Sequence, residues 1–154
     1  MERGSRDTLI TAAAYVARAA VGIALIGAGT IKAAHPADFI RDIWTYRLVP
    51  EDYAYWIAAF LPWLEIATGA ALVANRQRAG ASLLAAGMLA AFLAAILISW
   101  IRGLDIACGC FGGPAAGGAT NYAWLVSRDL LLLGCLAFGV LADRWQRRRT
   151  VIRD

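Results

Sequence analysis

Two cysteines, Cys108 and Cys110, are separated by a single glycine. A disulfide between them would close a very small ring, and strained disulfides are the more oxidising and labile ones. The central glycine relaxes the backbone constraint on that ring. The pair therefore has three interpretations: a redox-active dithiol, a soft-metal site, and a structural pair in a tight loop. Thiolates bind Cu(I) and Zn, but no histidine or methionine lies nearby, and we predict no bound metal.

Four ionisable residues interrupt long apolar stretches of the sequence: Arg18, Glu65, Arg128 and Asp129. Burial of a charged side chain in an apolar environment costs free energy, so such residues mark an ion or proton pathway or form ion pairs with one another. We expect these residues to pair between helices in the interior of a bundle. Such a group would be a neutral network that fixes helix register, or a proton relay or polar pocket for a redox head group. Glu65 is the candidate for the protonatable residue, helped by Arg18 and Arg128.

The remaining candidates surround this predicted site. Arg102 lies shortly before the cysteine pair, where its charge would favour the thiolate. Trp63 is a candidate for cofactor binding, as are Arg18 and Arg128. Four tryptophans would either line an aromatic pocket or lie at the membrane interface, where aromatic residues are common, namely Trp56, Trp63, Trp100 and Trp124. Cys135 lies about 20 Å along the last apolar stretch if that stretch is helical, so we expect it to be a small packing residue.

The elements that must position these residues are membrane-spanning helices. The chain has 154 residues, of which 60% are hydrophobic and 17% charged, and its mean hydropathy is +0.58. Soluble domains carry about a quarter charged residues. Four apolar stretches are long enough as helices to cross a bilayer core of about 30 Å, namely residues 9–31, 54–74, 79–101 and 122–142. The sequence predicts an all-α integral membrane four-helix bundle forming a single domain.

Arginine placement predicts the orientation of this bundle. Nine basic residues lie before the first stretch, between the second and third, and after the fourth: Arg3, Arg6, Arg76, Arg78, Arg144, Arg147, Arg148, Arg149 and Arg153. The positive-inside rule then places both termini in the cytoplasm. The loops at 32–53 and 102–121 face the other side of the inner (plasma) membrane. Because topology explains the basic residues, no nucleic-acid partner is expected.

Three further features of the sequence concern helices. The first apolar stretch is too long for a signal-peptide core and contains Arg18, so we expect a retained helix. The outer loop contains an amphipathic pattern in which Phe39, Ile43 and Tyr46 share one face, after Pro36 and before Pro50. This pattern predicts a helix lying in the membrane interface, which either only rests on the membrane or forms one wall of a site beneath it. We expect five glycines to permit close helix packing, namely Gly22, Gly27, Gly29, Gly80 and Gly87.

Short motifs are spread along the chain from about residue 9 to residue 142. In order they are Gly29–Lys32, His35–Phe39, Tyr46–Pro50, Leu61–Glu65 followed by Gly69, Arg102–Gly103, and Cys108–Gly112. In these motifs the chain resembles the MauE family of methylamine-utilisation membrane proteins, part of the wider DoxX-like group. The last two motifs are the specific ones.

The resemblance implies a four-helix membrane bundle associated with disulfide formation or thiol redox outside the cytoplasm. It also implies a thioredoxin-like partner and a role in maturing an amine dehydrogenase. The chain is similar in plan to quinone-linked disulfide oxidases such as DsbB and vitamin K epoxide reductase, which suggests quinone as a cofactor. Those proteins use two cysteine pairs and one is visible here, so a partner would exchange directly with Cys108 or Cys110.

The favoured function is therefore thiol–disulfide exchange by a membrane oxidoreductase, with the lipid bilayer and a thioredoxin-like protein as partners. A function of a different class remains open. In that alternative the chain is a non-enzymatic membrane subunit or a protein that handles a soft metal.

Overall fold

The computed structural model describes residues 2–104 and 121–151, which are almost entirely helical. The helices are α1 (Glu2–Ala34), α2 (Pro36–Tyr46), α3 (Glu51–Val73), α4 (Arg78–Ile101) and α5 (Tyr122–Val151). These residues contain no strand, which confirms the all-α prediction. Segments of four helices are long and apolar enough to cross a membrane: Asp7–Ala34, Glu51–Val73, Arg78–Ile101 and Tyr122–Trp145.

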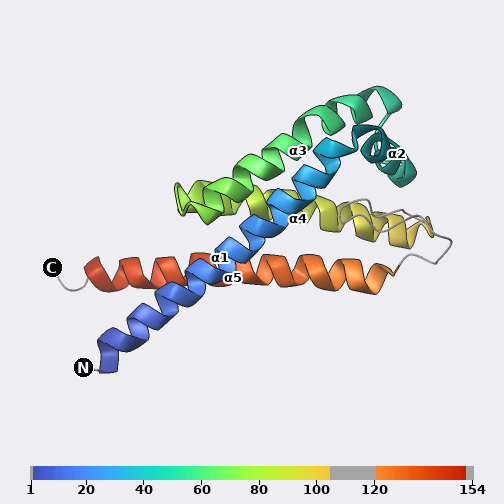
Figure 1. Cartoon of the computed structure of the whole chain (residues 1–154). Helices are drawn as coiled ribbons and strands as arrows, with labels where there is room; N and C mark the ends of the chain where they lie inside the picture. Colours follow the sequence, from blue (N-terminus) through green and yellow to red (C-terminus); the bar gives the residue numbers. More distant parts are fainter. Residues whose placement is uncertain (1, 105–120, 152–154) are drawn as a thin grey trace.

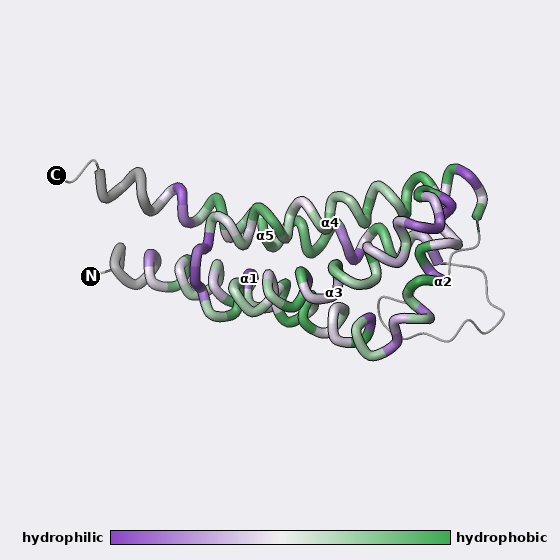
Figure 2. The backbone as a smooth tube through the Cα atoms, turned by 90° about the horizontal axis from the view of Figure 1, so that it is seen from above, coloured by the Kyte–Doolittle hydropathy of each residue, from purple (hydrophilic) through white to green (hydrophobic). Residues whose placement is uncertain are grey.

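The four long helices form a bundle with α2 at one end (Figure 1). Helix α1 packs against α3 and α5, while α4 packs against both α3 and α5. The start of α1 and the end of α5 both lie at the end of the bundle that is opposite α2. Figure 2 shows hydrophobic residues along most of the four long helices, and hydrophilic residues around α2 and at the turn between α3 and α4.

Glycines bring α1 and α3 into close contact. A Cβ atom added to Gly22 would lie 2.7 Å from the carbonyl oxygen of Gly69, and one added to Gly29 would lie 2.6 Å from that of Pro62. These contacts place the two helices antiparallel, because Gly22 lies opposite a later residue of α3 than Gly29 does. The expectation of close packing is confirmed at Gly22 and Gly29.

Three other glycines do not have the packing role expected of them. A Cβ atom at Gly27, Gly80 or Gly87 would meet no heavy atom within 4 Å. These positions face the outside of the bundle, so the glycine pattern in the sequence overstates the number of close helix contacts. Small residues in an apolar helix are therefore an ambiguous signal, because the sequence alone does not show which face meets another helix.

The bundle has a small apolar core, and many large hydrophobic side chains also lie on its exterior. Seven buried residues from all four long helices form the main core: Val21, Leu25, Leu72, Ala81, Ala85, Leu89 and Leu136. Cys135 packs against this core, as expected for a small packing residue. Large hydrophobic side chains such as Leu83, Ile101 and Leu131 point outward and are mostly exposed. An exterior that exposes many large hydrophobic side chains suits contact with lipid.

Helix α2 matches the amphipathic helix predicted in the outer loop. Pro36 occupies its first turn, where a missing N–H costs nothing, and Arg47 ends it in the left-handed conformation, with φ of 48°. Its Phe39 side chain is buried beneath the helix. Trp44 packs edge-to-face on Tyr55 of α3, with ring centroids 6.1 Å apart. These contacts hold α2 across one end of the bundle.

Candidate functional site

A buried ion pair joins α1 to α3 just below α2. The Lys32 ammonium donates a hydrogen bond to Glu65 Oε1, and the two side chains are 2% and 0% exposed. The ammonium also lies 5.2 Å from the ring centroid of Phe39 and 4.7 Å from that of Phe92. Aromatic faces attract a cation, more strongly where water is excluded. Lys32 is thus held by a carboxylate and two rings.

Lys32 lies in a different place from the one the sequence suggested. The first span was expected to end at residue 31, which put Lys32 in the outer loop, whereas α1 continues to Ala34. Because α1 includes Lys32, the Lys32 side chain lies inside the bundle, where it pairs with Glu65 of α3. The available signal was that Lys32 is the sole lysine of the chain and follows three residues after Gly29. Those two positions lie on the same face of a helix.

Arg18 does not pair with Glu65. It forms an ion pair with Asp143 at 2.6 Å and donates to the carbonyl oxygen of Gly139 at 3.1 Å, which joins α1 to α5. Arg18 lies about 21 Å along α1 from Lys32, too far to reach the carboxylate that Lys32 holds. The expected partnership of Arg18 with Glu65 is therefore wrong. Asp143 lies one residue beyond the predicted end of the fourth span, so the sequence did not predict it as a partner.

Arg128 and Asp129 bond to each other within α5. Both Nε and Nη2 of Arg128 donate to Asp129 Oδ1, at 2.9 and 2.8 Å. The Asp129 side chain is 1% exposed and that of Arg128 is 18% exposed. This contact lies between neighbours on one helix, which differs from the expected pairing between helices. The carboxylate takes two charge-assisted hydrogen bonds on one oxygen.

The two ion pairs meet at a small cavity in the bundle. Its volume is about 20 Å³, and its charged lining residues are Lys32, Glu65, Arg128 and Asp129. Two carboxylate oxygens, Glu65 Oε2 and Asp129 Oδ2, are buried without a hydrogen-bond partner among the described residues. A cavity of this size and polarity has room for one water molecule. With both carboxylates ionised the four residues have no net formal charge, and uptake of one proton by either carboxylate would raise the charge of the group to +1.

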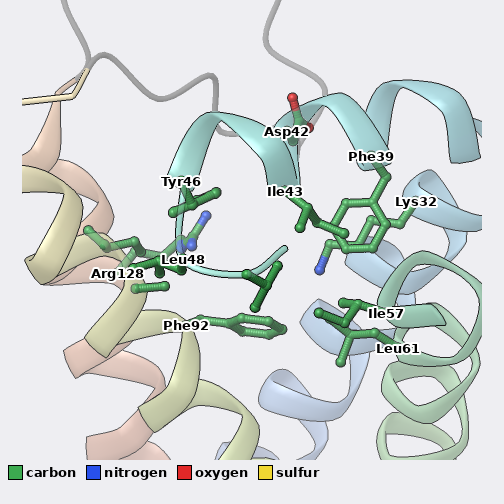
Figure 3. Close-up of a pocket in the computed structure, with 13 residues that line it drawn as sticks. Lys32, Phe39, Asp42, Ile43, Tyr46, Leu48, Ile57, Leu61, Phe92 and Arg128 are labelled. Carbon is green, nitrogen blue, oxygen red and sulfur yellow. The ribbon is translucent and has the colours of Figure 1, made fainter. Parts of the chain in front are cut away.

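A larger cavity lies above it, between α2 and the bundle. Its volume is about 170 Å³, and most of its lining is apolar: Phe39, Ile43, Tyr46, Leu48, Val49, Ile57, Leu61, Phe92, Ala95 and Ile96. Figure 3 shows residues of α2 above the cavity, Phe92 below it, and Ile57 and Leu61 on the α3 side. Lys32, Phe92 and Arg128 line both cavities. The charged group thus forms the inner boundary of an apolar cavity.

The tryptophans do not line this cavity. Trp63 is 65% exposed on the outside of the bundle, and the other three tryptophans expected with it are also exposed. Trp56 stacks on Phe60 and Trp100 stacks on Tyr122, with centroids 6.0 and 5.8 Å apart. The aromatic rings at the cavity belong to phenylalanine and tyrosine. Tryptophan at membrane-span positions more often faces the lipid interface, which explains the difference.

The cysteine pair lies outside the described residues, but both ends of its loop are described. The Tyr122 hydroxyl donates to the carbonyl oxygen of Leu104, and both residues pack with Ile96 of α4. Tyr46 of α2 belongs to the same cluster. Arg102 is exposed and donates to the carbonyl oxygen of Arg47 at 3.2 Å, which ties α4 to the end of α2. The loop therefore starts and ends beside the larger cavity.

The comparisons with known proteins agree with this architecture. A family model described as methylamine utilisation protein MauE matches residues 10–142. The chain belongs to the MauE family. A relative within it, methylamine utilization protein MauE of Paracoccus denitrificans, is 28% identical over 127 residues, which cover 82% of this chain and 67% of the relative. No solved structure matches the chain. Family membership and the four candidate spans together make it a multi-pass membrane protein.

Proposed function

We propose that this MauE-family chain takes part in methylamine utilisation as a membrane thiol–disulfide redox protein. In this proposal Cys108 and Cys110 exchange electrons with a thioredoxin-like partner outside the cytoplasm, in the maturation of an amine dehydrogenase. The observation that carries it is a Cys-Gly-Cys sequence in a loop whose two ends meet beside the apolar cavity and its buried charges. The chain acts in the inner membrane, with both termini in the cytoplasm.

The length of chain after Leu104 limits how far the cysteines can lie from this end of the bundle. Cys108 follows Leu104 by four residues, and four residues of extended chain span at most about 14 Å. Leu104 in turn is held by the Tyr122 hydroxyl beside α2. The positive-inside rule assigns the opposite end, where the termini lie, to the cytoplasm. These two arguments support placement of the thiols on the oxidising side of the membrane, where disulfides persist.

The exchange proceeds through a mixed disulfide. A thiolate of one loop cysteine attacks the partner's disulfide, forms an S–S bond to one partner sulfur and displaces the other as a thiolate. The second loop cysteine then attacks the mixed disulfide and releases the partner in its dithiol form. Two electrons and two protons pass from Cys108 and Cys110 to the partner, and the reverse sequence returns them.

The described candidates have separate parts in this proposal. Arg102 places a permanent positive charge within the few residues before the pair, which favours the thiolate. Glu65 and Asp129 handle protons at the inner cavity, where each has one oxygen without a described partner. Arg18 lies far from this end and has a structural part, because its charge is matched by Asp143.

The first prediction concerns partner trapping. Changing the resolving cysteine to serine stops exchange at the mixed disulfide, so Cys108→Ser or Cys110→Ser should accumulate an adduct of higher mass that reductant releases. The adduct is read on non-reducing gels and its partner by mass spectrometry. The matched control is Cys135→Ser, whose sulfur packs against the core of the bundle, and it should give no adduct.

The proposal is contradicted if neither loop variant gives a reducible adduct in cells that express the pathway. A soft metal bound to protein purified under reducing conditions, and lost in both loop variants, would replace it with the metal-handling function.

A further inference from the structure

We propose that the 170 Å³ cavity beneath α2 binds a neutral, lipid-soluble molecule of the benzoquinone class, whose ring carbonyl accepts a hydrogen bond from Lys32. The use of that molecule as electron carrier for the cysteine pair rests on the proposed function. All residues that line the cavity belong to the described part of the chain, so the test of binding does not need the cysteines.

The size of the cavity fits one substituted six-membered ring. An engineered apolar cavity of about 150 Å³ in another protein takes up benzene, and this cavity is about 170 Å³. Its walls at Ile43, Ile57 and Leu61 are aliphatic, and Phe92 closes it on the side facing the bundle. An apolar ring gains the free energy of burial here, while a hydrocarbon tail extends into the surrounding lipid.

Lys32 supplies the polar contact. Its ammonium has three donor protons, and among the described residues Glu65 Oε1 is the hydrogen-bond acceptor. The rings of Phe39 and Phe92 flank the ammonium, and Figure 3 shows the Lys32 side chain reaching the cavity beside Phe39. A ligand oxygen in the cavity can therefore accept a hydrogen bond from another N–H of the Lys32 ammonium. An apolar cavity with few convergent polar groups is typical of small-molecule sites.

The charge balance favours a neutral head group over an anion. Lys32 is matched by Glu65 and Arg128 by Asp129, so the inner boundary of the cavity has no net formal charge. Asp42, at the rim, points away from the cavity in Figure 3. A carboxylate head would add a buried charge without a free counterion, which is costly. A carbonyl adds a dipole and no charge.

The electron count suits the proposed exchange. Forming one disulfide from two thiols releases two electrons and two protons, and a benzoquinone that takes up both becomes a quinol. This step belongs to the direction of exchange in which the partner's dithiol has reduced the loop disulfide. The quinone is then the oxidant, the loop dithiol is the reductant, and each ring oxygen receives one proton.

Photolabelling tests the site directly. The full chain carrying Cys108→Ser, Cys110→Ser and Cys135→Ser is placed in nanodiscs, because free thiols react with quinones. An azido derivative of decyl-benzoquinone is photolysed with it, and labelled peptides are mapped by mass spectrometry. The proposal predicts label within residues 39–49 and 92–96, and its loss in the presence of excess decyl-benzoquinone. Label spread over all lipid-facing helices without competition would overturn it.

Two neighbouring alanines of α4 provide a matched pair of variants. Ala95 lines the cavity, whereas Ala94 is exposed on the outside of the same helix. Ala95→Phe fills the cavity and should reduce labelling of these segments at least tenfold, whereas Ala94→Phe should leave it unchanged. Ile57→Phe fills the cavity from α3 and serves the same purpose if Ala95→Phe does not fold. Equal labelling in the cavity-filling variants and Ala94→Phe would overturn the site.

Decanoate distinguishes the two head groups, since it has a tail of the same length and a carboxylate. Decanoate should not compete for labelling at concentrations where decyl-benzoquinone does, and equal competition would overturn the neutral head. Loss of the site with partner trapping intact would overturn this inference alone. Trapping that fails while labelling persists would overturn the proposed function and leave the binding site in place.

Discussion

At the scale of single residues, the feature that organises this protein is the buried Lys32–Glu65 pair. Both charges are removed from solvent, which costs several kcal/mol for each ion, and their attraction offsets this cost only while both are present. The rings of Phe39 and Phe92 add to the stabilisation of the ammonium. The pair thus fixes α1 against α3 and sets a donor at the boundary of the larger cavity.

The prediction at this scale concerns Glu65→Gln. The variant leaves the Lys32 ammonium buried without its counterion, so we expect the free energy of unfolding to fall by about 3–5 kcal/mol. Glu51→Gln is the matched control, because Glu51 is exposed at the start of α3, and its effect should stay within about 0.5 kcal/mol. Unfolding in detergent is followed by loss of helical signal against denaturant.

A second change separates charge from packing in this test. Lys32→Met added to Glu65→Gln removes the unpaired charge and should restore part of the lost stability. Equal, small effects of Glu65→Gln and Glu51→Gln would show that the pair does not hold α1 against α3.

The charged residues were predictable from the sequence, but most of their partners were not. Arg18, Glu65, Arg128 and Asp129 are conspicuous because they interrupt apolar stretches, and all of them are buried or largely buried. Which residue forms an ion pair with which depends on how far two helices are shifted relative to each other along their axes. The pattern of residues within one helix does not determine that shift. A shift of one helical turn, about 5.4 Å, is enough to exchange one partner for another.

At the scale of elements, the close antiparallel packing of α1 on α3 positions the site. The backbones approach at Gly22, Gly29 and Gly69, where a Cβ atom would lie within 2.7 Å of a carbonyl oxygen on the opposite helix. Close approach of this kind increases dispersion contacts between helices that gain little from the hydrophobic effect in lipid. The spacing also places Lys32 within reach of Glu65.

Two glycine variants test this interface. Gly69→Ala places a methyl group 2.5 Å from the carbonyl oxygen of Gly22, so the helices must separate, and overpacking of this kind costs about 1–3 kcal/mol. Gly27→Ala, in open space on α1, should be neutral or stabilising by up to about 1 kcal/mol because alanine favours helix. Thermal unfolding in one detergent compares the two, and a Gly69→Ala variant as stable as Gly27→Ala would contradict the interface.

Element types followed from the sequence more readily than element contacts did. The four apolar stretches and the amphipathic pattern at Phe39, Ile43 and Tyr46 predicted five helices, because length and periodicity are local properties. A site beneath the amphipathic helix was one of its two interpretations, but the other walls of the cavity were not predicted, since they depend on how far α2 stands from α3 and α4. Phe92 was missed for the same reason: nothing in its neighbourhood of leucine and alanine marks it as a cavity wall.

At the scale of the whole molecule, the bundle has two different ends. The termini and the α3–α4 turn lie at one end, and α2 and the ends of the cysteine loop lie at the other (Figure 1). Two ion pairs lie between these ends: Arg18–Asp143 is nearer the termini, and Lys32–Glu65 is nearer α2. The proposed function assigns electron exchange to the α2 end.

The orientation of this molecule is testable by fusion. Basic residues concentrate at the end with the termini, so we expect both termini in the cytoplasm. Alkaline phosphatase, which is active only after export, should stay inactive when fused after Asp154, and the same enzyme inserted between Arg47 and Pro50 should be active. The reverse result would place the cysteine loop in the cytoplasm, where disulfides are rare, and would contradict the proposed exchange.

The central claim, a reversible disulfide outside the cytoplasm, is tested most directly by thiol labelling of intact cells. In a Cys135→Ser background, only Cys108 and Cys110 remain to react with a membrane-impermeant maleimide that adds a countable mass. The account predicts no added mass before reduction and two added masses after brief treatment with a reductant. Full labelling of both cysteines without reductant, or labelling only after the membrane is permeabilised, would contradict it.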